Sequence, residues 1–211
     1  MKSNAVKSYA LDLDWSAQTM LPIELNGEEL HLEARAYQGT DPHNQAFVLI
    51  NRTSQAGNEL PYVRVHSGCV TGDIFHSLKC DCYPQLQASM EKITTSPLGV
   101  LIYLPYHEGR GIGLVNKLRA YTLQDWGLDT LDANRVLGWG ADERNFLIGA
   151  NMLLSMGITK VRLLTNNPDK IAGLTACGVE VVGREAHAFA SNEVNDDYLS
   201  TKKTRFGHLL E

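Results

Sequence analysis

The chain has 211 residues, of which 44% are hydrophobic and 20% charged, a balance typical of a soluble globular protein that can bury a full core. Its formal net charge of -5 argues against a general nucleic-acid-binding protein, which normally carries a basic face. Residues 1–18 lack a continuous apolar segment, and no stretch approaches the roughly 18 apolar residues of a membrane span. We therefore expect a cytoplasmic protein without a signal peptide.

The first part of the chain predicts β-strands. Residues 21–37 alternate apolar and polar side chains on both sides of the pair Asn26 and Gly27, which is a strong signal for a hairpin turn. Residues 45–52 and 60–67 also have the composition of strands. We expect a strand-rich N-terminal third.

After Cys82 the sequence alternates between helical and strand patterns. In residues 84–93, Leu86, Met90 and Ile93 recur at helical spacing, and Pro84 suits the first turn of a helix. The further expected elements are a buried strand at 99–104, a helix at 112–127 with Leu114, Leu118 and Tyr121 on one face, a helix at 142–157, a strand at 160–165, a helix at 166–178 and a strand at 179–184. This alternation predicts an α/β fold, a single layered α/β/α domain over residues 1–211 with a mixed sheet.

Three of the four cysteines, Cys69, Cys80 and Cys82, lie close together with the spacing C-x10-C-x-C. A disulfide set is disfavoured, because disulfides are rare in the cytosol and Cys80 and Cys82 flank a single residue. Three alternatives stay open: a structural metal site, a metal site with one position free for chemistry, or three unrelated buried thiols. The fourth cysteine, Cys177, lies at the end of an expected helix, and we interpret it as an ordinary buried residue.

Polar and glycine-rich segments follow several expected strands, where loops usually carry function. The run EGRGIG, residues 108–113, would let backbone N–H groups approach an anion ahead of a helix, although a plain glycine turn explains the same pattern. The run TNNPDK, residues 165–170, could bind phosphate through its hydroxyl, its amides and Lys170, or could simply cap the next helix. Asp142 could likewise be no more than a helix cap.

Seven motifs appear in a fixed order: RVHSGCVTGD, SLKCDC, EGRGIGL, NKLRAY, ADER, LLTNNPDK and, near the C-terminus, GHLL. Together they resemble the GTP cyclohydrolase II family, whose zinc enzymes open riboflavin synthesis. The resemblance is strong from about residue 60 to the end and looser before it. It implies GTP as the small-molecule substrate, a homodimer, and neither a nucleic-acid nor a membrane partner. Longer bifunctional relatives carry an N-terminal synthase domain, for which we expect no room in a chain of this length.

The resemblance assigns a metal site. Cys69, Cys80 and Cys82 match the ligands of one Zn²⁺ per chain, and three thiolates with water in the fourth place form a catalytic rather than a structural set. Zinc lowers the pKa of such a water from about 15.7 towards 7, which suits opening of the guanine imidazole ring with release of formate. The family also releases pyrophosphate, which normally needs Mg²⁺ on the triphosphate, and its product is 2,5-diamino-6-(5-phosphoribosylamino)pyrimidin-4(3H)-one.

The other matched positions are expected to bind the nucleotide or carry phosphate chemistry. Asp142 matches the family's proton acceptor, Arg144 its proposed nucleophile and Tyr121 a tyrosine of the catalytic site. Because arginine is poor at giving up a proton, we expect Arg144 to clamp the transferring phosphate, although the nearby Asp142 could support either role. The positions that match nucleotide-binding residues are Arg64, Val65, His66, Ser67, Gly68, Gln85, Glu108, Gly109, Arg110, Thr130, Thr165 and Lys170.

Basic residues gather in these motifs although the chain is acidic overall. They are Arg64, Arg110, Lys117, Arg119 and Lys170. A triphosphate needs such a local concentration of positive charge. We expect Arg110 and Lys170, at element junctions, to serve it, and we interpret Lys117 as a side chain on a solvated helix face.

Two positions depart from the usual pattern of the family. Gly68 stands where a glutamate usually precedes the first zinc cysteine, and Pro105 stands where an arginine is expected, in a loop with one extra residue. We expect Tyr106 and His107 in this loop to compensate for the lost arginine. These changes favour a paralogue that serves another pathway or that has a changed substrate or product. Two alternatives to GTP cyclohydrolase II activity stay open: an enzyme with another purine nucleotide or heterocycle as substrate or with a truncated reaction, and a zinc-stabilised binding protein without turnover.

Overall fold

The computed structural model describes residues 17–38 and 45–209. Seven strands form one mixed sheet in the order β1-β2-β3-β5-β4-β6-β7. The strands are β1 (Ala17–Leu25), β2 (Glu28–Gln38), β3 (Gln45–Arg52), β4 (Tyr62–Ser67), β5 (Leu98–Leu104), β6 (Lys160–Leu164) and β7 (Glu180–Glu185). The helices are α1 (Cys82–Thr95), α2 (Gly113–Asp125), α3 (Thr130–Val136), α4 (Leu147–Ser155), α5 (Pro168–Ala176) and α6 (Asp196–Phe206), with a π-helical turn η1 (Val70–Ile74) and a 3-10 segment η2 (Pro105–Gly111).

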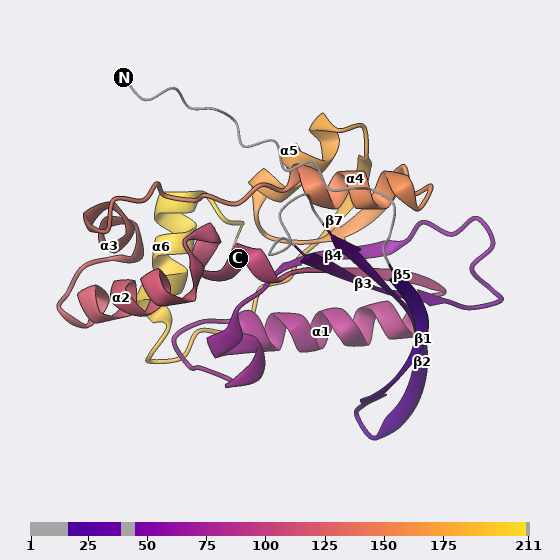
Figure 1. Cartoon of the computed structure of the whole chain (residues 1–211), viewed down its shortest axis with the longest axis horizontal. Coiled ribbons are helices and arrows are strands. Elements are labelled where there is room, and N and C mark those ends of the chain that lie inside the picture. Colours follow the sequence, from indigo (N-terminus) through magenta and orange to yellow (C-terminus); the bar gives the residue numbers. More distant parts are fainter. Residues whose placement is uncertain (1–16, 39–44, 210–211) are drawn as a thin grey trace.

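The layered arrangement confirms the predicted α/β/α fold. Figure 1 shows α1 on one side of the sheet and α4 and α5 on the other, while α2, α3 and α6 gather beyond the ends of the strands. No helix of the described residues is long and apolar enough to span a membrane. The expected lack of a signal peptide concerns residues that lie mostly outside the described ranges.

The predicted hairpin is present at one edge of the sheet. β1 and β2 pair antiparallel, with Leu25 opposite Glu28, so the turn has only two residues. Both of them, Asn26 and Gly27, have positive φ values of 53° and 82°. A two-residue turn of this kind matches the twist of the flanking strands, and asparagine and glycine adopt it most easily.

The parallel half of the sheet places the functional loops. β4 lies between β5 and β6 and pairs parallel with both. The chain passes from β4 to β5 through α1 on one face, and it reaches β6 through α4 on the other face (Figure 1). Where successive connections leave to opposite faces, a crevice opens at the carboxyl ends of the strands, and ligands of α/β proteins bind there. The loops after β4, β5 and β6 meet at this point.

Both faces of the sheet bury apolar side chains. Along β5, Val100 and Ile102 join the main core with Met152 of α4, whereas Leu101 points to the opposite face and packs with Ile93 of α1. This division follows from the two-residue period of a strand. The predicted stripe of α1 is confirmed, because Leu86 and Met90 pack on the same small core as Ile93.

Two helix predictions were wrong in detail. The helix expected from Asp142 begins only at Leu147, because the Asp142 carboxylate accepts hydrogen bonds from the backbone and guanidinium of Arg144 and so holds a turn. In α2, Leu114 and Leu118 are 39% and 49% exposed. The buried face of this helix instead carries Lys117 and Ala120, because Lys117 contacts Cys69 in the interior of the protein. The helices α3 and α6 had not been predicted.

Candidate functional site

A pocket lies at the carboxyl ends of β4, β5 and β6, and residues of α2, α3 and α6 also line it. All but three of the residues predicted for the site line it. The lining residues among them are Arg64, His66, Ser67, Gly68, Cys69, Cys80, Cys82, Gln85, Gly109, Arg110, Tyr121, Thr130, Arg144, Thr165 and Lys170. Val65 is fully buried in the main core, and Glu108 and Asp142 lie behind the wall, where each pairs with a basic residue of the pocket.

The three clustered cysteines form a set that can hold a metal. The Sγ atoms of Cys69, Cys80 and Cys82 all lie within 4.8 Å of one another, and those of Cys69 and Cys80 are 3.8 Å apart. A tetrahedral zinc ion with Zn–S bonds of about 2.3 Å separates its sulfur ligands by about 3.8 Å, so the spacing suits zinc. None of the thiols forms a disulfide. A Cβ on Gly72 would lie 2.8 Å from the Cys80 sulfur, so only glycine leaves this space clear.

No histidine of the described residues completes this set. The Nε2 of His66 lies 3.1 Å from the Asp73 carboxylate instead, and the ring of His76 stacks on Tyr83 with centroids 3.7 Å apart. Three protein ligands with a fourth position free is the pattern of catalytic zinc sites. The geometry therefore fits an open site better than a closed structural one.

Lys117 is not a solvated side chain, contrary to the sequence-based interpretation. Its Nζ lies 2.9 Å from the sulfur of Cys69 and 2.6 Å from Oε1 of Glu108, and the residue is only 8% exposed. Burial alone would lower the pKa of Lys117, but the charges of Cys69 and Tyr121 and the hydrogen bonds to Cys69 and Glu108 together outweigh burial and raise the pKa. Hydrogen bonds from the other two thiols, and then the charge of Lys117, lower the pKa of Cys69.

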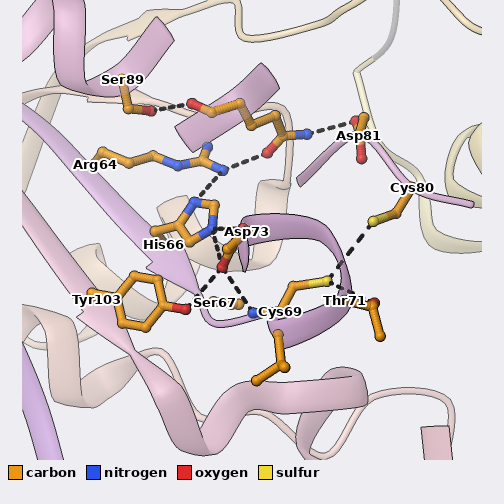
Figure 2. Close-up of polar contacts among 12 residues, drawn as sticks. Arg64, His66, Ser67, Cys69, Thr71, Asp73, Cys80, Asp81, Ser89 and Tyr103 are labelled. Carbon is orange, nitrogen blue, oxygen red and sulfur yellow. Dashed lines mark hydrogen bonds and ion pairs between the residues drawn. The ribbon is translucent and has the colours of Figure 1, made fainter. Parts of the chain in front are cut away.

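Asp73 connects residues 69–82, the loop that carries the three clustered cysteines and is called the metal loop below, to the sheet, as Figure 2 shows. Its carboxylate accepts hydrogen bonds from the backbone N–H of Cys69 at 2.9 Å, from the Tyr103 hydroxyl at 2.9 Å and from Nε2 of His66. Burial lowers the pKa of His66, so the ring is neutral, and donation from Nε2 leaves Nδ1 as an acceptor facing Arg64. The motif GCVTGD contains this aspartate, but nothing in its spacing indicated a bond to His66.

A chain of polar contacts connects the metal loop with the predicted nucleotide ligands. Gln85 accepts a hydrogen bond from the guanidinium of Arg64 and donates one of 2.6 Å to Asp81, which lies between Cys80 and Cys82 in the sequence. Asp81 is in turn paired with Lys202 of α6 at 2.5 Å. The Asp81–Lys202 pair is almost fully buried, and it had not been predicted.

The opposite side of the pocket is strongly basic. Nζ of Lys170 donates to the backbone carbonyl of Val65 at 2.8 Å and has no carboxylate partner among the described residues. Burial, and then the charges of Arg64 and Arg144, lower its pKa well below the usual value. Such mutual repulsion among buried cations is relieved when a polyanion binds between them.

Arg144 is held in one orientation. Its Nε and NH2 donate to the Asp142 carboxylate at 2.8 and 2.5 Å, and its NH1 donates to the Ser67 hydroxyl at 3.2 Å. Burial would lower the pKa of Arg144, but the hydrogen bonds to Asp142, together with the negative charge of Asp142 and of more distant groups, outweigh burial and raise the pKa. Burial would raise the pKa of Asp142, and the same bonds lower it. Both groups therefore stay charged.

Four buried polar atoms of pocket-lining residues have no hydrogen-bond partner among the described residues. They are Nε of Arg64, Nε2 of His107, NH1 of Arg110 and Nδ2 of Asn166. Buried polar atoms in proteins are nearly always paired, with protein, water or ligand. Their shared place around one pocket indicates a polar ligand.

Gly68 and Pro105, the two positions at which we expect a departure from the family pattern, lie against each other. A Cβ on Gly68 would lie 2.9 Å from Cα of Pro105 and 3.1 Å from the carbonyl oxygen of Leu104. The loop after β5 therefore leaves no room for a side chain at position 68. Of the two residues expected to compensate, His107 lines the pocket, while Tyr106 packs against the main core and is not among the lining residues.

The comparisons with known proteins agree with this geometry. A sequence model of the family described as GTP cyclohydrolase II matches residues 16–186. The chain belongs to the GTP cyclohydrolase II family. Relatives of the family include a protein named GTP cyclohydrolase-2 from Azospirillum brasilense, 46% identical over 188 residues, which are 89% of this chain and 48% of that protein. GTP cyclohydrolase-2 from Teredinibacter turnerae is 51% identical over 156 residues, 74% of this chain and 78% of that protein.

A longer family relative is the riboflavin biosynthesis protein RibBA from Synechocystis sp., 43% identical over 204 residues. That match covers 96% of this chain but only 36% of the relative. The chain thus spans about half or less of the length of two of these relatives. The family match ends at residue 186, so it leaves out α6, whose residues Tyr198 and Lys202 also line the pocket.

Proposed function

We propose that the chain is a GTP cyclohydrolase II, which hydrolyses GTP, opens the guanine imidazole ring and releases formate and pyrophosphate. The observation that carries the proposal is that one pocket joins a three-thiolate metal set to a cluster of buried cations. A nucleoside triphosphate needs both, because hydrolysis takes place at its base and its phosphates carry the negative charge. The names and identities of the family relatives support this substrate.

The residues of the metal end have distinct tasks in this proposal. Cys69, Cys80 and Cys82 would hold Zn²⁺, which when bound supplies Lewis acidity for hydrolysis of the ring. Lys117 offsets the charge of three thiolates. Burial raises the pKa of Tyr121 to about 12, so its hydroxyl keeps its proton and can donate a hydrogen bond to the opening ring. Glu108 acts as the partner of Lys117 rather than as a direct ligand of the nucleotide.

The cationic end would hold the triphosphate together with a Mg²⁺ carried by the phosphates. Arg144 stays protonated through its bidentate bond with Asp142, and a protonated guanidinium cannot attack phosphorus. We therefore assign Arg144 the role of a clamp on the phosphate and Asp142 that of its orienting partner. Arg64, Arg110 and Lys170 supply further positive charge, and Thr130 and Thr165 supply hydroxyl groups at the wall.

A cyclohydrolase-like enzyme with a changed substrate is the second candidate. The observation that favours it is that Gly68 and Pro105 lie against each other. We expect a glutamate and an arginine at these positions in the family, so a carboxylate and a guanidinium are both missing from one part of the site. Comparing GTP with ATP and with guanosine diphosphate as substrates separates the two candidates. Turnover restricted to a nucleotide other than GTP would favour the second.

We further propose that the protein is a cytoplasmic homodimer. Support comes from the family resemblance and from apolar side chains that α2 leaves in solvent, with Val115 64% and Leu118 49% exposed. Exposed apolar groups gathered on one helix often mark a protein interface. Analytical ultracentrifugation of the parent and of Leu118→Glu tests this assignment. A monomeric parent would contradict it.

The central experiment incubates zinc-loaded protein with GTP and Mg²⁺ and measures formate and pyrophosphate separately. We expect both products from the parent. Cys80→Ser should lose bound zinc and formate release while keeping some pyrophosphate release, because the clamp lies apart from the thiolates. Cys177→Ser is the matched control, since this cysteine lies outside the cluster. Absence of formate from the metal-loaded parent would reject the proposal.

A further inference from the structure

The C-terminal helix α6 lies against the pocket although it follows residue 186, where the match to the family model ends. Tyr198 and Lys202 on this helix, and His208 just after it, line the pocket. Figure 1 shows α6 beside α2 and α3, beyond the ends of the parallel strands. A helix in this place can act on the bound ligand directly or through the side chains of other loops.

The first connection runs from Lys202 to the metal loop and to Gln85. Nζ of Lys202 lies 2.5 Å from Oδ1 of Asp81, and Nε2 of Gln85 donates to the other oxygen of that carboxylate at 2.6 Å. The side-chain carbonyl of the same Gln85 accepts from Arg64. Without Lys202, the Asp81 carboxylate would be a buried charge without a cation, and it would draw Gln85 or a water molecule towards itself.

The second connection holds Arg110. The guanidinium of Arg110 lies 3.9 Å from the ring centroid of Phe206 and 5.7 Å from that of Tyr198, both on α6. The backbone of Arg110 is in the left-handed conformation, with φ 62°. Residues other than glycine rarely adopt this conformation unless the surrounding structure holds them in it. NH1 of this buried guanidinium has no hydrogen-bond partner among residues 17–38 and 45–209. The two rings of α6 therefore hold in place the buried guanidinium of Arg110, a residue that lines the pocket.

The end of α6 is tied to a third loop. Gly207 ends the helix in a left-handed conformation, and the next N–H, of His208, donates to the Lys202 carbonyl at 3.0 Å. The following N–H, of Leu209, donates to the Asn166 carbonyl at 2.9 Å, in the loop after β6. Arg205 also pairs with Asp129 at the start of α3 at 2.8 Å. The segment thus contacts the loop after β5, the start of α3 and the loop after β6, each of which carries a predicted nucleotide ligand.

We propose that α6 is a positioning helix for a purine nucleoside triphosphate, which orients Gln85 through Lys202 and Asp81 and orients Arg110 through Phe206 and Tyr198. The inference rests on the proposed function, since the nucleotide site is the one proposed above. It assigns to residues 196–208 a part in substrate binding, with Lys202, Tyr198 and Phe206 as positioning residues. Their loss should weaken binding of the nucleotide more than it slows the reaction of bound substrate.

The test compares neighbouring lysines on the same helix. Lys202→Met removes the cation from Asp81, whereas Lys203→Met makes the same change at the exposed neighbouring position. We expect Lys202→Met to raise KM and the Kd for GTP by about 10-fold or more, with kcat within about threefold and zinc content unchanged. Lys202→Arg should recover most of the affinity, because it keeps the charge next to Asp81. Lys203→Met should behave like the parent.

A second pair of variants keeps the test valid if Lys202→Met fails to fold. Phe206→Leu removes the aromatic face under Arg110, and Phe206→Tyr restores it, so only the leucine variant should raise KM. Equal KM and Kd in Lys202→Met and Lys203→Met, or in the two Phe206 variants, would overturn the inference while leaving the proposed function intact. Failure of the parent to release formate from GTP would overturn the proposed function, and isothermal titration with GTP would still decide the role of α6.

Discussion

The Nζ of Lys117 and the sulfur of Cys69 are 2.9 Å apart, deep in the wall of the pocket. A zinc ion with three thiolate ligands carries a net charge of -1, and burying that charge is unfavourable unless a cation accompanies it. Lys117 supplies that cation, and its second contact with Glu108 fixes its position. Because Glu108 also accepts a hydrogen bond from the backbone N–H of Val70, the same carboxylate anchors the residue next to the metal ligand.

Lys117→Met should therefore weaken zinc binding. A charge-assisted hydrogen bond contributes about 1.5–3 kcal/mol, so the apparent affinity should fall by about 10- to 150-fold. Competition with a chromogenic chelator measures the affinity, and the thiolate-to-metal charge-transfer band of the cobalt-substituted protein should shift. The exposed Lys160→Met is the control. Unchanged zinc affinity and an unchanged cobalt spectrum in Lys117→Met would contradict the assigned role.

Arg144 and Asp142 should support phosphate chemistry without affecting the metal. Arg144→Lys keeps a positive charge but loses the bidentate contact with Asp142, so pyrophosphate release should fall by about 10- to 100-fold rather than vanish. Asp142→Asn should have a similar effect, because Arg144 loses its orientation. Zinc content should equal that of the parent in both. Complete loss of pyrophosphate release in Arg144→Lys would favour a nucleophilic arginine over a clamp.

Gly68 should tolerate no side chain while Pro105 is present. Gly68→Ala places a methyl group 2.9 Å from the Pro105 backbone, and such overpacking costs about 1–3 kcal/mol of folding stability. In a chain of this size, each kcal/mol corresponds to about 2–4 °C in Tm. Gly183→Ala is the matched control, since its added Cβ meets only Arg162 Cγ at 4.0 Å. Equal melting temperatures of the two variants would show that the loop after β5 can move to accommodate a side chain at position 68.

The loop residues His107 and Tyr106 should differ in their effects. His107→Ala removes a ring that lines the pocket and carries a buried, unpartnered Nε2, so KM for the nucleotide should rise by about 2- to 10-fold. Tyr106→Ala should lower Tm instead, because its ring packs against the main core. Steady-state kinetics and thermal unfolding of both variants separate these effects. A raised KM with unchanged Tm for Tyr106→Ala would contradict this division.

Local signals in the sequence predicted the elements whose geometry depends on neighbouring residues. The Asn26–Gly27 turn and the stripe of Leu86, Met90 and Ile93 need only a short segment to be recognised. The close spacing of the cysteines gave the metal set for the same reason. In each case the interacting residues are close together in the sequence.

Contacts between distant segments could not be predicted in this way. Lys117 and Lys202 have the composition of solvated helix positions, and only tertiary packing places them against Cys69 and Asp81. The wrong start of α4 has a related cause, because Asp142 has the character of a helix cap but binds the side chain of Arg144. Charged side chains that serve a site therefore resemble surface residues until the fold is known.

A last prediction concerns acid stability. Burial, and then the charge of Arg64, lower the pKa of His187 from 6.5 to about 4. The ring Nε2 donates to the Gln85 carbonyl at 2.7 Å, which requires no positive charge. Between pH 6.5 and about 4, His187 is protonated in the unfolded chain but not in the folded protein. The contribution of neutral His187 to the free energy of unfolding is therefore full above pH 6.5 and is lost as the pH falls towards about 4.

His187→Gln should reduce the pH dependence of the free energy of unfolding in that window by up to about 1.4 kcal/mol per pH unit, the value for one proton. Burial likewise lowers the pKa of His107 and that of His208 to about 3, so a residual slope of the same sign should remain. Urea unfolding from about pH 7 to about pH 5 measures the slope at a fixed zinc concentration. His31→Gln is the control, because His31 is exposed on β2 and its removal leaves the buried histidines in place. An identical slope in His187→Gln and His31→Gln would mean that His187 takes up its proton without unfolding, for instance by a local opening of its contacts with Gln85 and Ser89.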